Sequence, residues 1–304
     1  MEKREYFISE LEGIKEVPTL PQIAFKLIAL LSDTNSSMRE ISDLIQDDPP
    51  LVAKILRIVN SGYYHIRNEV KSIRQAVVLL GMEEIRNLIF ALSVFSTFYY
   101  IKGNKYFDFM KFWKHSAATG KVTMVIANYL GLPHASDAFI HGLLHDFGRL
   151  TLQLYFRDEY EKVFEYGIEK GVPLYQAELE VMEFGHDEAG AWLAQKWNLP
   201  SDLTETILKH HKITPDEVEK MLIPSLVYVA DCITNIWGVG IEPLPRLKSL
   251  EEDEIWLKLQ EIYPKLKTFP LEEMTRIFDM HLEEAELFAE QISQYHRLAE
   301  DTSA

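Results

Sequence analysis

Apolar residues recur every three or four positions along most of this chain, and Gly or Pro interrupts the pattern at intervals. That spacing places apolar side chains on one face of a helix. In residues 47–62, for example, Asp48 suits a helix cap, Pro49 suits the first turn and Gly62 suits the exit. No run of alternating apolar and polar residues indicates a β-strand. The sequence therefore predicts an all-α fold.

The same pattern divides the chain into segments. Helices are expected over 36–46, 47–62, 72–80, 82–95, 111–130, 135–146, 159–170, 174–184, 186–198, 201–211, 223–237, 251–262 and 271–298. Residues 100–110 are a break in the pattern, and residues 241–250 contain two prolines. We therefore expect an N-terminal helical lobe over 1–110, a second lobe over 111–240 and a C-terminal helical extension over 241–304, packed on the core.

Charge and cysteine content exclude several functions. The chain has 31 basic and 47 acidic residues, a net charge of -16 that repels a phosphate backbone. Its one cysteine, Cys232, leaves no intrachain disulfide and no thiolate metal cluster. Residues 1–15 lack the apolar segment of a signal peptide, and residues 88–95 are too short to span a bilayer. We expect a cytoplasmic protein that binds neither nucleic acid nor a membrane.

Histidine and aspartate recur in a fixed order on predicted helices. The order is His115, His145, Asp146, His186, His210, His211 and Asp231. One such histidine alone is more often a core or surface residue than a ligand. Together, imidazole and carboxylate form a mixed donor set for a divalent transition metal, with Fe or Mn favoured and Ni, Co or Zn as alternatives. A shared carboxylate can hold two ions, an arrangement used to hydrolyse phosphate esters.

Several longer stretches of the sequence resemble a known protein family. The stretches VPTLPQIAFKLIALL (17–31) and DDPPLVAKILRIVNSGYY (47–64) resemble the N-terminal pattern of HDOD domains, the HD-related output domains of bacterial signalling proteins. SIRQAVVLLGMEEIRNL (72–88) resembles the middle segment of these domains. GLLHDFGRL (142–150), EFGHDEAGAWLAQKWNLP (183–200), ILKHH (207–211) and ADCI (230–233) resemble their metal-site half. The resemblance spans about residues 16–235 and implies a multi-helix bundle like that of HD phosphohydrolases.

The resemblance also implies roles for single residues. The implied metal ligands are His115, His145, Asp146, His186, His210 and Asp231, with His211 as a further one. Asp146 and Arg149 are the implied catalytic residues, and the ligand is a nucleotide or another phosphate ester. Arg149 stands where the related HD-GYP phosphodiesterases carry Lys, and their Gly-Tyr-Pro segment is replaced by ITPDEVEK (213–220). The resemblance therefore does not favour cleavage of cyclic dinucleotides.

Three interpretations stay open from the sequence. The chain is a metal-dependent phosphohydrolase, a non-catalytic signalling module that binds a partner protein, or a protein whose site holds no metal. Among other residues near the motif, His141 suits a structural role or a hydrogen bond to a ligand, and Gly148 suits the end of a helix. Glu178 and Glu180 could reach a metal, but a solvated helix face is the simpler interpretation.

Overall fold

The computed structural model describes residues 3–31, 45, 48–60, 64, 66–101, 103–241 and 249–270. Helices and turns make up this part of the chain, and it contains no β-strand, so the predicted all-α fold is confirmed. Within the described residues, no helix is both long enough and apolar enough to cross a membrane.

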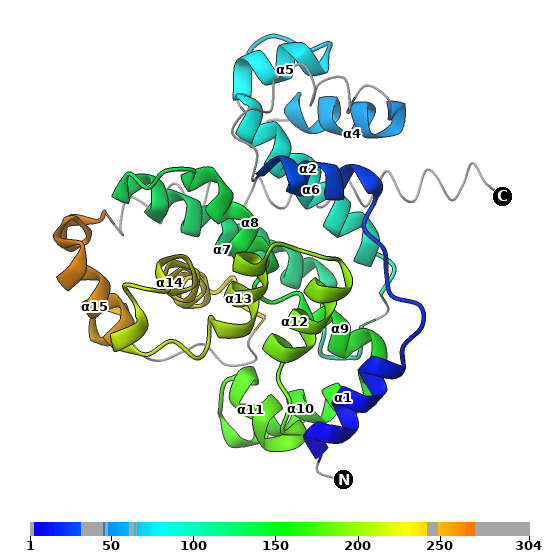
Figure 1. The fold of residues 1–304 in the computed structure, drawn as a ribbon, viewed down its shortest axis with the longest axis vertical. Coiled ribbons are helices and arrows are strands. Elements are labelled where there is room, and N and C mark those ends of the chain that lie inside the picture. Colours follow the sequence, from blue (N-terminus) through cyan, green and yellow to red (C-terminus); the bar gives the residue numbers. More distant parts are fainter. Residues whose placement is uncertain are drawn as a thin grey trace. The chain divides into compact units, whose positions relative to one another are not determined.

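The chain divides into two compact units (Figure 1). The described part of one unit lies within residues 20–97 and contains α2 (Gln22–Leu31), α4 (Pro49–Val59), α5 (Ile73–Leu80) and nearly all of α6 (Met82–Phe98). The other unit, called the second unit below, comprises residues 1–19 and 98–270. The described residues of 1–19 and 98–110 therefore belong to the same unit as the histidine-bearing segments. Separate domains over 1–110, 111–240 and 241–304 stay a prediction.

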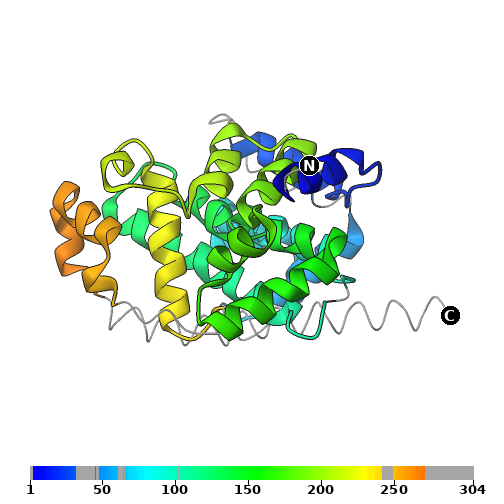
Figure 2. The same ribbon diagram turned by 90° about the horizontal axis from the view of Figure 1, so that it is seen from below.

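The second unit carries most of the helices. They are α1 (Lys3–Gly13), α7 (Phe109–Leu130), α8 (Ala138–Leu144), α9 (Gly148–Tyr155), α10 (Arg157–Lys170), α11 (Leu174–Met182), α12 (His186–Lys196), α13 (Ser201–Lys209), α14 (Leu222–Ile236) and α15 (Glu254–Ile262). Short 3-10 turns occur at Ala135–Asp137, Pro215–Glu217, Leu250–Glu252 and Pro264–Thr268. Helix α14, drawn in yellow in Figure 2, packs along α7 and also contacts α8 and α13.

Local signals in the sequence set several helix ends. The Asp48 side chain accepts a hydrogen bond from the Leu51 amide at 3.0 Å, so the predicted cap of α4 is confirmed. At α7, Asp108 accepts from two backbone amides, and Gly131 ends the helix at a φ of 74° that favours glycine. Asn60 bonds Val70 through both the Val70 amide and carbonyl, and so fixes the segment that leads into α5.

Two glycine contacts let the helices of the second unit approach closely. A Cβ atom on Gly142 of α8 would lie 2.6 Å from the Gly120 Cα of α7. A Cβ atom on Gly148 of α9 would lie 1.8 Å from the carbonyl oxygen of His186, at the start of α12. Because real Cβ atoms do not approach so closely, these two pairs of helices depend on glycine, and each pair carries one predicted metal ligand, His115 on α7 and His186 on α12.

Most helices expected from the sequence are present within a few residues of their predicted bounds. Helices α1, α2 and α9 were not expected, and the predicted helix over 135–146 is a 3-10 turn followed by the shorter α8. Four predictions lie wholly or largely outside the described residues: the helix over 36–46, the exit at Gly62, the connector over 241–250 and the helix over 271–298.

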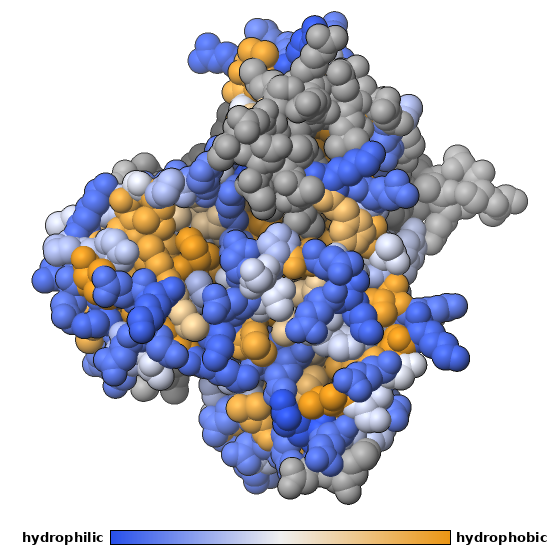
Figure 3. All heavy atoms as spheres, in the orientation of Figure 1, coloured by the Kyte–Doolittle hydropathy of each residue, from blue (hydrophilic) through white to orange (hydrophobic). Residues whose placement is uncertain are grey.

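The face shown in Figure 3 is hydrophilic over most of its described surface, with hydrophobic residues gathered in separate patches. The most exposed large apolar side chains are Val78 at 72% and Tyr100 at 58%. A single exposed apolar side chain is ordinary on a protein surface.

Candidate metal centre

The predicted ligands come from five elements of the second unit. His115 lies on α7, and His145 and Asp146 lie in the turn between α8 and α9. His186 is the first residue of α12, His210 and His211 directly follow α13, and Asp231 lies on α14. All are buried except His211, which is partly exposed. Residues separated by more than a hundred positions in the sequence therefore meet inside the unit.

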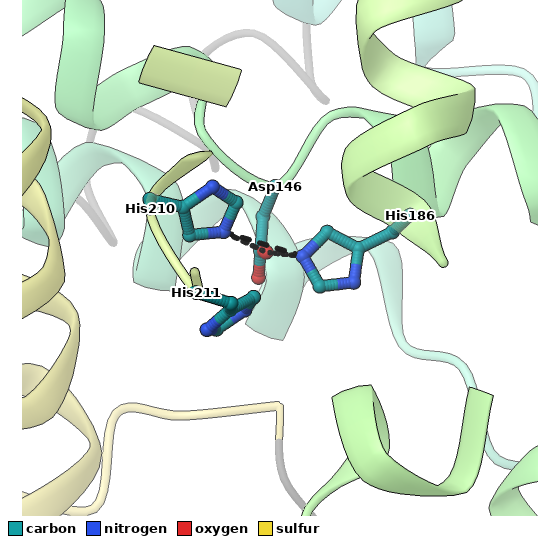
Figure 4. A group of neighbouring side chains, drawn as sticks. All are labelled: Asp146, His186, His210 and His211. Atoms are coloured by element: carbon teal, nitrogen blue, oxygen red, sulfur yellow. Dashed lines mark hydrogen bonds and ion pairs between the residues drawn. The ribbon is translucent and has the colours of Figure 1, made fainter. Parts of the chain in front are cut away.

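Asp146 is the centre of this cluster. Its Oδ1 atom lies 2.9 Å from His186 Nε2 and 3.7 Å from His210 Nε2. Figure 4 shows these two imidazoles facing the same carboxylate from different sides, with His211 beside them. Its other oxygen, Oδ2, lies 3.7 Å from His115 Nε2 and 3.6 Å from His145 Nε2. The two oxygens of one carboxylate thus face two different pairs of histidines.

These contacts define two overlapping donor groups. Asp146, His186, His210 and His211 each offer a donor atom within 4.8 Å of the others, and so do His115, His145 and Asp146. Asp231 extends the second group, because its Oδ1 atom lies 3.2 Å from His115 Nε2 and 3.8 Å from His145 Nε2. The structure therefore brings all seven predicted ligands together.

Hydrogen bonds at Nδ1 turn the Nε2 atoms of three histidines toward the cluster. His145 Nδ1 donates to the Gly142 carbonyl at 2.7 Å, and His210 Nδ1 donates to the Ile207 carbonyl at 2.8 Å. His186 Nδ1 bonds Glu178 Oε2 at 2.6 Å. The buried Nε2 of His145 has no hydrogen-bond partner among the described residues. A buried donor atom of this kind, aimed at two carboxylates, fits a metal ion.

A buried arginine balances part of the negative charge. Arg149 is 2% exposed, with its Nε atom 2.9 Å from Asp146 Oδ2 and its Nη1 atom 3.7 Å from Glu178 Oε1. Burial opposes ionisation of Asp146, but Arg149 and the nearby imidazoles outweigh it and hold the pKa of this carboxyl well below its ordinary value. Asp146 is therefore a carboxylate at neutral pH, as a metal ligand must be.

The histidines of the cluster differ in their electrostatic surroundings. Burial lowers the pKa of His210, which favours the neutral form that binds metals. Burial also disfavours charge on His186, but the carboxylates of Glu178 and Asp146 outweigh it and raise its pKa to about 9. An ion bound at His186 must therefore replace a proton.

His211 differs from the other predicted ligands in its surroundings. Its ring stacks on Tyr175 with the centroids 4.4 Å apart, and the Tyr175 hydroxyl donates to Asp187 Oδ2 at 3.4 Å. Lys212 forms an ion pair with the same Asp187 carboxylate. Because His211 is the partly exposed member of its donor group, this side of the cluster lies nearest to solvent.

Comparison with known proteins decides the family. A model of the HDOD domain matches residues 17–213, which is more than half of the chain. The chain belongs to the HDOD family. The matched range includes every predicted ligand except Asp231, so the HDOD match stops short of the residue 235 expected from the sequence.

Other proteins resemble this HDOD chain over most of its length. A Geobacter sulfurreducens HDOD domain protein with unknown function is 26% identical, with a TM-score of 0.81, and the match covers 92% of this chain and 96% of that one. A Shewanella amazonensis SB2B protein, provisionally assigned as a phosphohydrolase, is 25% identical, with a TM-score of 0.68, and covers 93% and 97% of the two chains. Both are similar in fold and sequence.

Curated relatives match this HDOD chain as part of longer proteins. An uncharacterized protein of Treponema pallidum (strain Nichols) is 26% identical over 239 residues, which are 77% of this chain and 46% of that protein. The B. subtilis protein YuxH is 31% identical over 90 residues, which are 29% of this chain and 22% of YuxH. The chain thus spans less than half the length of these two relatives.

The sequence did not predict Glu178 as part of the site. Its side chain is fully buried, whereas Glu180 is exposed, so the predicted solvated face is correct for Glu180 and wrong for Glu178. Helix α11 ends at Met182, and Glu183 adopts a left-handed conformation with a φ of 56°. The chain then turns back and places His186 beside Glu178. A left-handed residue between two short helices has no strong sequence signal unless it is Gly or Asn.

The predicted role of Gly148 is also wrong. Helix α8 ends at Leu144, and Gly148 begins α9 instead of ending α8. Its backbone lies against His186 and Gly190 at the start of α12, where a side chain does not fit. Gly148 therefore brings the turn that carries Asp146 up to the helix that carries His186.

His141 lies beside the cluster but in neither donor group. Its Nδ1 atom bonds Thr206 Oγ1 at 2.8 Å, and its Nε2 atom lies 3.9 Å from Asp202 Oδ2. Since the Thr206 hydroxyl donates to the Asp202 carbonyl at 3.0 Å, it accepts from His141. This arrangement agrees with the structural role predicted for His141, which joins α8 to α13.

His141 should make the stability of the protein depend on pH. Burial lowers its pKa to about 4, despite Asp202 nearby, whereas the pKa of a histidine in the unfolded chain is close to the ordinary value of 6.5. The unfolded chain therefore binds a proton that the folded chain rejects, and stability falls as pH drops from 6.5 to 4. The loss from this one residue is on the order of 3 kcal/mol.

Urea unfolding at several pH values measures this effect. His141→Gln should lose less stability than the wild type between pH 6.5 and 4, while the matched variant of an exposed residue, His134→Gln, should follow the wild type. Equal pH dependence in the wild type and His141→Gln would show that His141 is not buried in its neutral form.

Proposed function

We propose that this HDOD protein is a signalling protein whose cluster binds divalent transition-metal ions, one or two per chain, and hydrolyses a phosphate ester. The observation that supports it is the position of Asp146, with each carboxylate oxygen facing a different pair of histidines. Iron or manganese suits this donor set, and nickel, cobalt or zinc would also accept it. A bound ion would supply Lewis-acid chemistry to a phosphoryl group.

Different residues of the protein would hold the ions, stabilise charge and admit the substrate. His186, His210 and His211 with Asp146 would hold one ion, and His115, His145 and Asp231 with Asp146 would hold the other. Arg149 contacts Asp146 and Glu178, so it would steady charge at the site through Asp146. The partly exposed side at His211 would admit the ester, and Lys212 lies next to it in the sequence.

Turnover by the purified protein tests this function. The full chain, loaded with Fe²⁺ or Mn²⁺, should hydrolyse at least one member of a panel of nucleotides, cyclic dinucleotides and an aryl phosphodiester. His145→Ala should abolish that turnover, while His134→Ala, at an exposed position outside both donor groups, should retain it. Failure of every metal and substrate combination would contradict hydrolysis.

A second function, a non-catalytic signalling module, has one observation in its favour. The Arg149 guanidinium is buried and its ion pairs are with carboxylates, so it is held inside the fold at the position where the related HD-GYP phosphodiesterases carry Lys. In that case the metal would stabilise the fold, and a protein partner would bind the surface. Capture of a specific partner that survives both His145→Ala and Asp146→Ala would support this second function.

A further inference from the structure

A buried carboxylate lies behind one of the ligand histidines. Glu178 Oε2 lies 2.6 Å from His186 Nδ1 and also accepts from the His186 backbone amide at 2.8 Å. On the opposite side of the same ring, Nε2 lies 2.9 Å from Asp146 Oδ1. The His186 imidazole is thus held between two carboxylates, one inside the donor group and one behind it.

Other buried groups hold Glu178 in this position. The Tyr160 hydroxyl donates to Glu178 Oε1 at 2.9 Å, and Arg149 Nη1 lies 3.7 Å from the same oxygen. Tyr160 is fully buried on α10, and Glu178 is fully buried on α11. Because Arg149 also contacts Asp146, one guanidinium connects the carboxylate of the donor group to the carboxylate behind it.

We infer that Glu178 is a positioning residue that sets the metal affinity of the cluster through His186. This inference rests on the metal binding proposed above. A carboxylate that accepts the Nδ1 proton leaves the Nε2 lone pair for an ion, fixes the plane of the ring and makes the imidazole a stronger donor. Glu178 therefore acts on the metal through His186 without touching it.

Substitution of Glu178 by Gln separates this role from packing. Gln has nearly the same shape, but its amide group can donate to Nδ1 and so favours the tautomer whose Nε2 carries a proton. We expect Glu178→Gln to bind Mn²⁺ about 10- to 100-fold more weakly than the wild type. The matched control, Glu180→Gln, changes an exposed residue of the same helix and should bind like the wild type.

A double-mutant cycle provides the decisive test. Mn²⁺ affinity is measured by electron paramagnetic resonance titration of the full chain for the wild type, Glu178→Gln, His186→Ala and the double variant. If Glu178 acts through His186, adding Glu178→Gln to His186→Ala should weaken binding less than twofold further. The unfolding of the metal-free proteins, followed by circular dichroism, shows whether each variant is folded.

Each outcome of this cycle has a distinct meaning. Additive losses of affinity, or wild-type affinity in a folded Glu178→Gln, would overturn the positioning role while leaving the proposed metal site intact. Failure of the wild type to bind Mn²⁺, Fe²⁺, Co²⁺, Ni²⁺ or Zn²⁺ would overturn the proposed function and this inference with it. Tyr160→Phe removes one donor to Glu178 and should weaken Mn²⁺ binding in the same direction by a smaller factor.

Discussion

Replacing Asp146 with Asn should eliminate stable metal binding. Both donor groups contain this carboxylate, and a neutral amide is a poor ligand for a divalent transition metal. Loss of a carboxylate shared by both donor groups should weaken binding by more than the roughly 100-fold seen for residues that only support a ligand. Elemental analysis of protein purified without chelator, together with Mn²⁺ titration, measures this loss directly.

The Asp146→Asn variant also tests whether the fold depends on the negative charge of Asp146. Asn keeps an oxygen that can accept from Arg149, so the variant should fold, although removing one partner of a buried ion pair costs about 3–5 kcal/mol. Asp202→Asn is the matched control, because the Asp202 side chain is 71% exposed and belongs to neither donor group. A folded Asp146→Asn that retains wild-type metal content would place any bound ion elsewhere.

Gly148→Ala should be the most destabilising of the small substitutions in the second unit. The added methyl group would meet the His186 carbonyl oxygen at 1.8 Å and the Gly190 amide nitrogen at 2.5 Å. Both atoms belong to the backbone, so no side chain can rotate away, and α9 must separate from α12. We expect a loss of at least about 3 kcal/mol in the free energy of unfolding. Denaturation by urea measures it.

Gly148→Ala should weaken metal binding as well as lower the free energy of unfolding. Separation of α9 from α12 moves Asp146 away from His186, so any Gly148→Ala that still folds should bind Mn²⁺ more weakly than the wild type. Gly13→Ala is the control, since a methyl group there meets no atom within 4 Å and should change stability by less than about 0.5 kcal/mol. Equal stability of Gly148→Ala and the wild type would contradict the close packing of these helices.

The sequence predicted the fold class and the residues that gather around Asp146 because both have local or ordered signals. Helical periodicity repeats within each segment, so it predicts α7 or α14 without knowledge of their neighbours. The ligands could be named because the resemblance fixes a residue type at each position. The metal itself, the role of these residues as its ligands and the catalytic roles of Asp146 and Arg149 stay predictions.

Residues that support the site were harder to predict, because their roles depend on tertiary contacts. The sequence around Glu178 gives a charged helix face, and only the turn at Glu183 brings Glu178 against His186. The sequence around Gly148 suggests a helix end. In the structure, the backbone of His186 and Gly190 on α12 leaves no room for a side chain at position 148. The resemblance implies a catalytic role for Arg149, and its burial against two carboxylates appears only when the helices pack.

Anomalous diffraction from crystals of the full chain grown with Mn²⁺ would test the central claim, that the cluster around Asp146 is a metal site, most directly. The structure predicts a peak about 2–2.5 Å from an oxygen of Asp146 and from the Nε2 atoms of at least two histidines of one donor group. At saturating Mn²⁺, a map with no peak near Asp146, or with its strongest peak at other residues, would contradict the account.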